Sequence, residues 1–162
     1  MTQYLETMEE GDQLRMSGPT SKRIYKGNYN WIISKKPYYR SKVGLVAGGT
    51  GIAPFYQLIQ EVVKFQDPLE ISLVYANKSE KDILLKDELE ELQRRHPENI
   101  KIHYIVDKAD HPETWDYDTG YLTKDILEKH LPPPGDDSMV FTVGPKPMNQ
   151  LVRKLIPEHL IV

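Results

Sequence analysis

From Lys42 onward, short apolar runs alternate along the chain with segments of helical spacing. The apolar runs cover residues 43–47, 71–76, 101–106 and 139–143. Their lengths are typical of strands that are buried on both faces of a sheet. A regular β-α-β order favours a parallel sheet with right-handed crossovers. The pattern therefore predicts an α/β fold, a doubly wound parallel sheet covering residues 42–162.

The segments between these runs predict four helices. The first follows Pro54, a residue well suited to a first helical turn, and has apolar residues at i, i+3, i+4, i+7 and i+8 from Phe55 to Val63. The second repeats leucine over 85–92 and ends before Pro97, and Ser79 with Asp82 could cap its start. The third is expected to begin after Thr123 as its cap, and the fourth covers 148–155.

Residues 1–41 have a different character, being polar, aromatic and rich in turn formers. Short strands are expected at 15–16, 24–25 and 31–33. These are too few to close a barrel or a sandwich. The basic segment 35–42 contains a proline and is interpreted as a linker. We expect this region to be the end of a β domain whose beginning lies outside the chain.

Composition excludes several classes of function. The 21 Lys and Arg residues are outnumbered by 24 Asp and Glu, and a net charge of -3 makes nucleic acid an unlikely partner. The chain has no Cys, which excludes disulfides, zinc-thiolate sites and thiol nucleophiles. Its five histidines lack the short spacing of metal-binding motifs, so no metal site is predicted. No apolar stretch approaches the ~20 residues of a membrane span, and a cytoplasmic location is expected.

Ligands of open parallel sheets bind outside the carboxyl ends of the strands, so the loops there are the candidate site. After the first strand comes Gly48-Gly49-Thr50-Gly51, directly before a helix. Glycines let the backbone approach a phosphate, and a helix start offers free N–H groups. The turn lacks the Gly-Lys-Ser/Thr of a nucleoside triphosphatase loop. It indicates either contact with a dinucleotide or close packing of helix against strand.

Three further loops follow the other strands. The loop at 77–80 is interpreted as a helix cap with solvated charges. Asp107 follows the third strand, where a carboxylate could accept hydrogen bonds from a ribose 2'-hydroxyl and would repel a 2'-phosphate; the alternative is a solvated loop carboxylate. The turn at 144–148 could present its backbone to a flat ligand, or its prolines could simply mark a strand-to-helix junction.

Taken together, these motifs resemble the pyridine-nucleotide half of the NADH-cytochrome b5 reductase family, within the ferredoxin-NADP reductase superfamily. The resemblance runs almost the length of the chain. In order, its motifs are Met1-Thr2-Gln3-Tyr4-Leu5, Gly48-Gly49-Thr50-Gly51-Ile52-Ala53-Pro54, Tyr75-Ala76-Asn77, Glu80-Lys81-Asp82-Ile83-Leu84-Leu85, Trp115-Asp116-Tyr117, His130-Leu131-Pro132-Pro133-Pro134 and Gly144-Pro145-Lys146-Pro147-Met148. It implies that residues 1–41 are the C-terminal remnant of an FAD-binding β barrel with its linker, and that 42–162 form an NAD-binding α/β domain.

The resemblance also implies a role for individual residues. Gly49 and Thr50 would line the pyrophosphate and nicotinamide side of a cleft, Asp107 would hold the adenine ribose, and Tyr121 would contact the adenine. The nicotinamide would be bordered by Gly144, Pro145 and Met148. The other cofactor-binding candidates are Gly48, Gly51 and Pro54, together with Met1 and Thr2, which stand at the end of the motif that binds the FAD pyrophosphate.

The chain departs from the family pattern at several points. Most of the barrel and its flavin-gripping Arg-x-Tyr-Ser/Thr are absent, so FAD is expected in the full-length protein rather than in this chain alone. Val143 stands where the family usually has a cysteine near the transferred hydride, and Ala53 replaces a threonine. The chain stops at residues 160–162 without the family's terminal aromatic ring.

The function implied is that of an oxidoreductase passing hydride from NADH to FAD and then electrons to cytochrome b5 or a similar haem protein. No catalytic acid or base is predicted, because hydride transfer depends mainly on positioning. A membrane would be reached only through a segment absent here, placing the full-length protein at its cytoplasmic face. Two alternatives stay open: a truncated, redox-inactive homologue that binds a nucleotide or a protein, and another reductase of the superfamily, such as nitrate reductase.

Overall fold

The computed structural model describes residues 4, 6–15, 17–18 and 21–162. The candidate FAD contacts Met1 and Thr2 therefore lie outside the described residues. So does Met16 of the strand expected at 15–16, and Arg15 itself is not in a strand. Within the described residues, no helix has the length and apolar character needed to cross a bilayer.

The main body is built on a parallel sheet with the strand order β7-β6-β5-β4-β8. Its four longer strands confirm the four apolar runs of the sequence, with ends within two residues of those expected. The short edge strand β7 was not predicted. The bounds are β4 Lys42–Gly48, β5 Glu70–Asn77, β6 Ile100–Val106, β7 Asp118–Thr119 and β8 Ser138–Val143.

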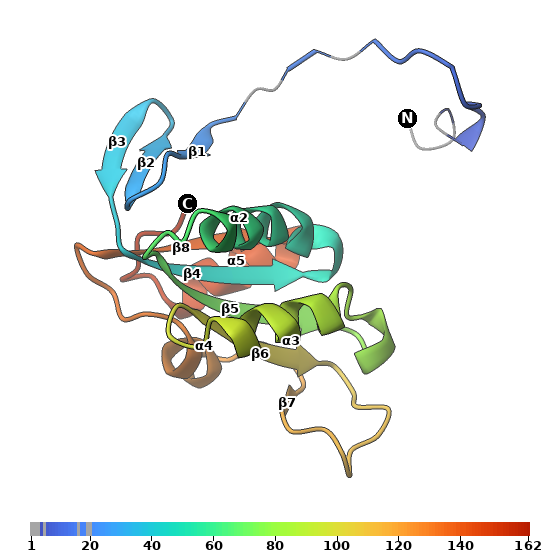
Figure 1. The fold of residues 1–162 in the computed structure, drawn as a ribbon. Helices are drawn as coiled ribbons and strands as arrows, with labels where there is room; N and C mark the ends of the chain where they lie inside the picture. Colours follow the sequence, from blue (N-terminus) through green and yellow to red (C-terminus); the bar gives the residue numbers. More distant parts are fainter. Residues whose placement is uncertain (1–3, 5, 16, 19–20) are drawn as a thin grey trace.

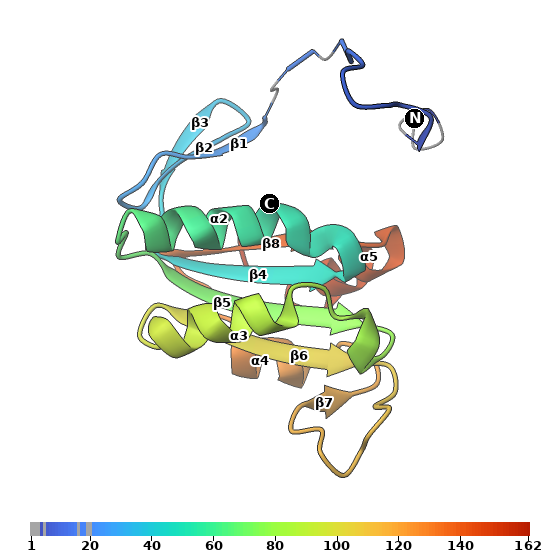
Figure 2. The same cartoon turned by 45° about the vertical axis from the view of Figure 1, so that its right-hand side comes forward.

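Helices cover both faces of this sheet, as a doubly wound fold requires. Helices α2 (Ala53–Lys64) and α3 (Lys86–Arg95) lie on the near face in Figure 2, and α4 (Lys124–His130) and α5 (Lys146–Leu155) lie behind it. Each face has its own apolar cluster. Phe55, Ile59 and Leu89 belong to the cluster under α2 and α3; Leu127 and Val152 belong to the cluster under α4 and α5.

The helix starts agree with the sequence in one case and differ in another. Thr123 caps α4 as predicted, its side chain accepting a hydrogen bond from the backbone N–H of Ile126 at 3.3 Å. The pair Ser79 and Asp82 does not cap α3. These two side chains hydrogen-bond to each other at 2.7 Å around a separate 3-10 turn, Glu80–Asp82. The left-handed Leu85, at φ 57°, separates that turn from α3.

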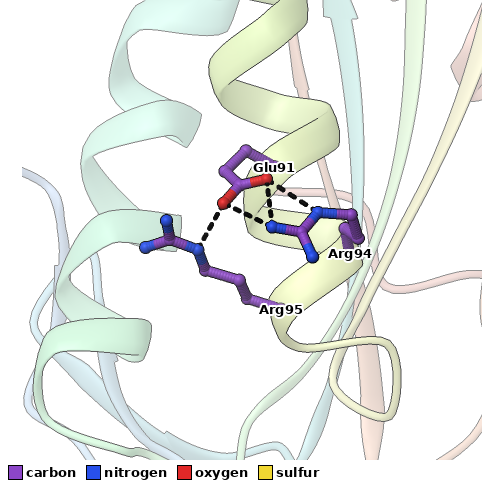
Figure 3. Close-up of polar contacts among 3 residues, drawn as sticks. All are labelled: Glu91, Arg94 and Arg95. Atoms are coloured by element: carbon purple, nitrogen blue, oxygen red, sulfur yellow. Dashed lines mark hydrogen bonds and ion pairs between the residues drawn. The ribbon is translucent and has the colours of Figure 1, made fainter.

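The solvent side of α3 carries an ion-pair cluster (Figure 3). The Glu91 carboxylate accepts hydrogen bonds from two arginines that lie one helical turn after it. Arg94 donates two of them, at 2.7 and 2.8 Å, and Arg95 donates the third. The hydrogen bond from Arg94 holds the pKa of Glu91 below its ordinary value, with Arg95 adding to the effect. Both arginine side chains are largely exposed and Glu91 is partly exposed, so the cluster marks the solvated face of the helix.

The N-terminal region forms a second, antiparallel sheet with the order β1-β2-β3. Its strands are β1 Arg23–Tyr25, β2 Asn30–Ile33 and β3 Lys36–Tyr39. The segment 35–42, expected to be a linker, is therefore mostly strand, and Lys42 already belongs to β4. Pro37 is tolerated in β3 because this is an edge strand, where a missing N–H costs no ladder hydrogen bond.

The small sheet is anchored to the main body by one carboxylate and one aromatic contact. Asp67, just after α2, accepts hydrogen bonds from the Tyr25 hydroxyl at 2.6 Å and from the Asn28 backbone N–H at 2.7 Å. The buried Trp31 ring packs against Phe141 of β8 with 5.2 Å between ring centroids. Figure 1 shows the three strands standing above α2 and β8, beyond which the described part of the N-terminal segment runs away from the body.

Candidate functional site

The loops that leave the parallel strands lie along a single edge of the sheet. In the pairing register Gly48 stands opposite Ala76, Asn77 opposite Val106, and Ala47 opposite Val143. Because neighbouring strands are about 4.8 Å apart, five strand ends extend over roughly 19 Å. We call this edge the strand-end row. Its loops, from β8 to β7, are Gly144–Pro145, Gly48–Gly51, Asn77–Ser79, Asp107–Lys108 and Gly120–Tyr121.

The row contains the point where the strand order reverses. Strands β5, β6 and β7 continue from β4 in one direction, whereas β8 lies on its other side. The crevice outside a doubly wound sheet opens at such a switch point. The loops after β4 and β8 flank it, so the Gly48–Gly51 turn and the Gly144–Pro145 turn are neighbours, as Figure 2 also shows for the ends of these strands.

The glycines of the first turn have different surroundings. A Cβ on Gly51 would lie 2.0 Å from the Val143 carbonyl oxygen, and one on Gly48 would lie 2.7 Å from the Met148 sulfur. These two glycines therefore allow close packing, one of the two interpretations of the motif. Gly49 has φ +54° with nothing within 4 Å of its Cβ position, and Thr50 is exposed. Gly49 and Thr50 are thus open to a ligand.

The backbone after this turn is suited to an anion. A 3-10 turn over Gly49–Ile52 leads directly into α2, and neither start has a side-chain cap or an acidic residue in its first turn. The Ala53 N–H donates to the Thr50 carbonyl, so the N–H groups that begin the 3-10 turn, together with the dipole of the helix behind them, are available to a phosphate. The buried Tyr75 hydroxyl donates a hydrogen bond to the Gly49 carbonyl at 2.9 Å, and burial raises the pKa of Tyr75, which keeps this donor protonated. Pro54 is exposed in the first turn of α2.

The turn after β8 is held rigidly beside the first one. A Cβ on Gly144 would lie 3.1 Å from the backbone of Gly48 and 2.6 Å from Met148. The Asn149 amide donates a hydrogen bond to the Gly144 carbonyl at 3.0 Å. Pro145 is exposed, whereas Met148 is half-buried and supports both turns from α5. Close backbone packing at the switch point therefore depends on the glycines of both loops.

The far end of the row holds an exposed carboxylate and an exposed aromatic ring. The Asp107 backbone N–H donates to the Asn77 carbonyl at 3.1 Å, which fixes the loop while its side chain faces solvent. Tyr121 is 80% exposed and follows Gly120, whose N–H donates to the Val106 carbonyl at 2.8 Å. Strand β7, which the sequence did not reveal, thus brings Tyr121 to the same edge as Asp107.

Sequence reasoning missed two features of the row. Lys78, Lys108 and Lys146 are all exposed and each follows the end of a strand within three residues, so three cations border the row. Their position directly after apolar runs was the available signal. Asn77 is only 9% exposed, and its side-chain amide has no hydrogen-bond partner among the described residues. A buried amide of this kind at a strand end is available to a ligand.

A large groove lies outside the row. It has a volume of about 1230 Å³ and runs between β1 and α2. Apolar side chains such as Trp31, Leu58 and Phe141 line it. Pro54 and Val143 also line it, so one end of the groove adjoins the switch point. The cavity thus meets the predicted nicotinamide end of the row.

The fold is that of an α/β domain whose strand-end row is a candidate nucleotide-binding site. The family described as "Oxidoreductase NAD-binding domain" matches residues 45–154, and the chain belongs to this family.

Individual relatives agree with this assignment and confirm the resemblance drawn from the motifs. The chain is 42% identical to human NADH-cytochrome b5 reductase 1 over 158 residues, covering 93% of this chain and 51% of that protein. It is 40% identical to NADH nitrate reductase 1 of rice, covering 91% of this chain and 16% of that protein. The cytochrome b5 reductase domain of Ulva prolifera nitrate reductase superposes with a TM-score of 0.88 at 32% identity, covering 99% of this chain and 64% of that structure. The chain spans about half the length of its human relative.

Proposed function

We propose that the chain binds NADH along the strand-end row and positions the nicotinamide at the switch point, as part of a flavoprotein reductase that passes the hydride to FAD. The observation that carries this proposal is the uncapped, glycine-lined start of α2 in the same row as the exposed Asp107. The family match and the names of the relatives support it.

The row's chemistry fits an extended dinucleotide. The free N–H groups around Thr50 would bind the pyrophosphate, with Lys78 and Lys146 contributing positive charge. Asp107 would accept hydrogen bonds from the adenine ribose, and Tyr121 would stack on the adenine. Gly48, Gly51 and Met148 would hold the turns in place, while Gly49, Pro54, Gly144 and Pro145 would border the nicotinamide.

The contribution of this chain to the reaction is positioning. Holding the nicotinamide flat at a fixed distance from the acceptor converts a bimolecular encounter into an effectively unimolecular step. FAD, when bound in the full-length protein, supplies the hydride acceptor and releases electrons one at a time. The apolar groove ends at Pro54 and Val143, beside the nicotinamide end, so its place and lining fit a flavin domain seated over α2.

We further propose cytochrome b5 or a similar haem protein as the electron acceptor, with the full-length protein at the cytoplasmic face of a membrane or free in the cytoplasm. The printed names of the relatives motivate this choice. A nitrate reductase is the second candidate, because the Ulva domain covers almost the whole chain at a high TM-score. Acceptor assays with cytochrome b5 and with nitrate on the full-length protein would separate the two.

Nucleotide selectivity tests the proposal most directly. We expect NADH to bind about ten-fold or more tightly than NADPH in a calorimetric titration, because Asp107 would repel a 2'-phosphate. Replacing this residue, Asp107→Asn, should remove most of the preference by strengthening NADPH binding. The matched control, Asp110→Asn, changes an exposed carboxylate three residues further on and should leave the preference intact. Equal affinity for the two nucleotides in the unmodified chain would contradict the assignment of Asp107.

Redox activity separates the reductase from a redox-inactive homologue. With FAD added, NADH-ferricyanide activity of the full-length protein is expected. A protein that binds NADH with the expected selectivity but shows no such activity would be a nucleotide binder only.

A further inference from the structure

Two imidazoles and a carboxylate meet on the face of the sheet opposite α2 and α3, away from the strand-end row. His103 comes from β6, Asp118 from β7, and His130 from the end of α4. One potential ligand atom from each lies within 4.8 Å of the other two. His103 Nε2 and Asp118 Oδ2 are 2.8 Å apart, and the two imidazole rings are stacked with 3.6 Å between centroids.

The fold itself brings these residues together. Asp118 pairs with Ile105, and His103 lies two residues earlier on the same strand, so both side chains project to the same face. Ile105 belongs to the apolar cluster that also contains Leu127 of α4. Helix α4 therefore packs over this face and delivers His130, its last residue, onto the His103 ring.

The site is built and partly buried. The His103 side chain is only 13% exposed, and the Tyr117 ring packs edge-on against it at 5.6 Å. The Nε2 atom of His130 is buried and has no hydrogen-bond partner among the described residues. This nitrogen is therefore open to a metal ion. A buried nitrogen without a hydrogen-bond partner is destabilising, and a bound cation would satisfy it.

We propose that His103, Asp118 and His130 form a binding site for a divalent zinc-like transition metal ion. Two imidazole nitrogens and one carboxylate oxygen are ligands that Zn²⁺ prefers, with water completing a tetrahedron. With metal-ligand distances near 2.1 Å, tetrahedral ligand atoms lie about 3.4 Å apart, a separation within the 4.8 Å that encloses the three ligand atoms here. Magnesium and calcium prefer oxygen ligands and are not expected to bind here.

Capture of the ion requires one side-chain movement. The stacked rings are inclined by only 12°, so their in-plane lone pairs run nearly parallel and do not converge on one point. Rotation of the His130 ring out of the stack would turn its nitrogen toward a metal ion held by His103 Nε2 and Asp118 Oδ2. His130 ends α4, so this rotation disturbs no following helical turn. The metal then takes the place of the proton between His103 and Asp118, which is released to water.

Metal binding would link three elements that are otherwise joined weakly at the sheet edge. The two-residue strand β7 leads through Gly120 to Tyr121, the residue proposed to contact the adenine. A metal-bound Asp118 would hold this edge strand against β6 and α4. The sequence predicted no metal site because the ligands come from three separate elements and have no short spacing, so only the folded chain brings them together.

The test uses the purified, tag-free chain titrated with Zn²⁺ and Co²⁺. We expect Zn²⁺ to raise the melting temperature of the unmodified chain and Co²⁺ to give the intense visible absorption of a four-coordinate site, with Mg²⁺ doing neither. The variants Asp118→Asn and His130→Gln should each weaken Zn²⁺ binding by about ten-fold or more. Asp118→Asn keeps an acceptor for His103, so its metal-free stability should change little.

The matched control is His111→Gln, which removes an exposed imidazole outside the cluster. Zn²⁺ affinity should be unchanged in this variant. The proposal is overturned if Asp118→Asn and His130→Gln bind Zn²⁺ as tightly as the unmodified chain. It is also overturned if binding is lost in His111→Gln instead, or if bound Co²⁺ shows only the weak absorption of an octahedral ion.

Discussion

The substitution Gly51→Ala isolates the packing role of the glycine turn. The added Cβ would lie 2.0 Å from the Val143 carbonyl oxygen and 2.7 Å from its carbonyl carbon. Both are backbone atoms of the last residue of β8, so no side-chain rotation relieves the contact. Either the 3-10 turn before α2 or the end of β8 must move by more than an ångström.

The expected cost is large for a single methyl group. Overpacking a core costs typically 1–3 kcal/mol, and a clash with backbone belongs at or above the upper end, so we expect a loss of about 3 kcal/mol or more. For a domain of this size each kcal/mol lowers the melting temperature by roughly 2–4 °C. Gly51→Ala should therefore lower it by about 6–12 °C.

Gly49→Ala provides the comparison within the same turn. Its Cβ meets no atom within 4 Å, and only the positive φ of +54° opposes it. A single left-handed alanine costs about 1–2 kcal/mol, so its melting temperature should fall by a few degrees only. Because Gly49 faces the open side of the row, its methyl group should weaken NADH binding while the fold persists.

Urea unfolding and differential scanning calorimetry of both variants, with NADH titration by calorimetry, make the comparison. Gly51→Ala is expected to lose more stability, and Gly49→Ala to retain its fold and lose affinity. If Gly51→Ala proved no less stable than Gly49→Ala, the close approach of the 3-10 turn to the end of β8 would be wrong. If Gly49→Ala bound NADH normally, the open side of the turn would not face the nucleotide.

Two further predictions concern the anchoring of the small sheet and the loss of stability at acid pH. Tyr25→Phe removes the 2.6 Å hydrogen bond to Asp67, and bonds to charged groups contribute about 1.5–3 kcal/mol, so the urea midpoint should fall accordingly. Lys42 donates a hydrogen bond to Asp137 at 2.9 Å, which holds the pKa of Asp137 below its ordinary value. Its carboxylate therefore adds stability above the unfolded-state pKa of about 3.9, and this is lost as pH falls through the lower folded-state value. Asp137→Asn should flatten the pH dependence of the melting temperature in this acid range.

Exposed residues of the same type provide the controls for these two variants. Tyr39→Phe removes the hydroxyl of a tyrosine that is 61% exposed, and should leave the urea midpoint unchanged. Asp136→Asn removes an exposed carboxylate next to Asp137 and should preserve the loss of stability at acid pH. If Tyr25→Phe and Tyr39→Phe changed the urea midpoint equally, the Tyr25–Asp67 contact would contribute nothing specific. If Asp137→Asn and Asp136→Asn changed the pH dependence equally, the same would hold for the Lys42–Asp137 contact.

The sequence alone predicted those helices and strands whose signal lies within a short stretch of the chain. The apolar runs that became β4, β5, β6 and β8 are mostly buried, so each has the sequence of a largely hydrophobic segment. Helix α2 has a full apolar stripe behind Pro54, and Thr123 caps α4 through a contact three residues away. Such features depend on neighbours in the sequence, which is why the doubly wound fold could be predicted.

Elements that depend on partners distant in the sequence were misjudged or missed. Strand β3 contains Pro37 and looks like a linker, yet it pairs with β2 as an edge strand. Strand β7 has two residues and exists only because β6 offers it a free edge. The pair Ser79 and Asp82 stabilises the 3-10 turn Glu80–Asp82 rather than α3. The left-handed Leu85 lies between that turn and the start of α3 and separates the two.

For the candidate site the division is similar. The sequence alone determined which loops follow parallel strands, and parallel strands necessarily end at one edge, so Asp107 and the Gly48–Gly51 turn could be assigned to a common row. Only the tertiary structure decided which glycine packs and which stays open, since that depends on how closely the end of β8 approaches the turn after β4. It alone also brought Tyr121 to the row and joined His103, Asp118 and His130, because those contacts form between elements that share no local pattern.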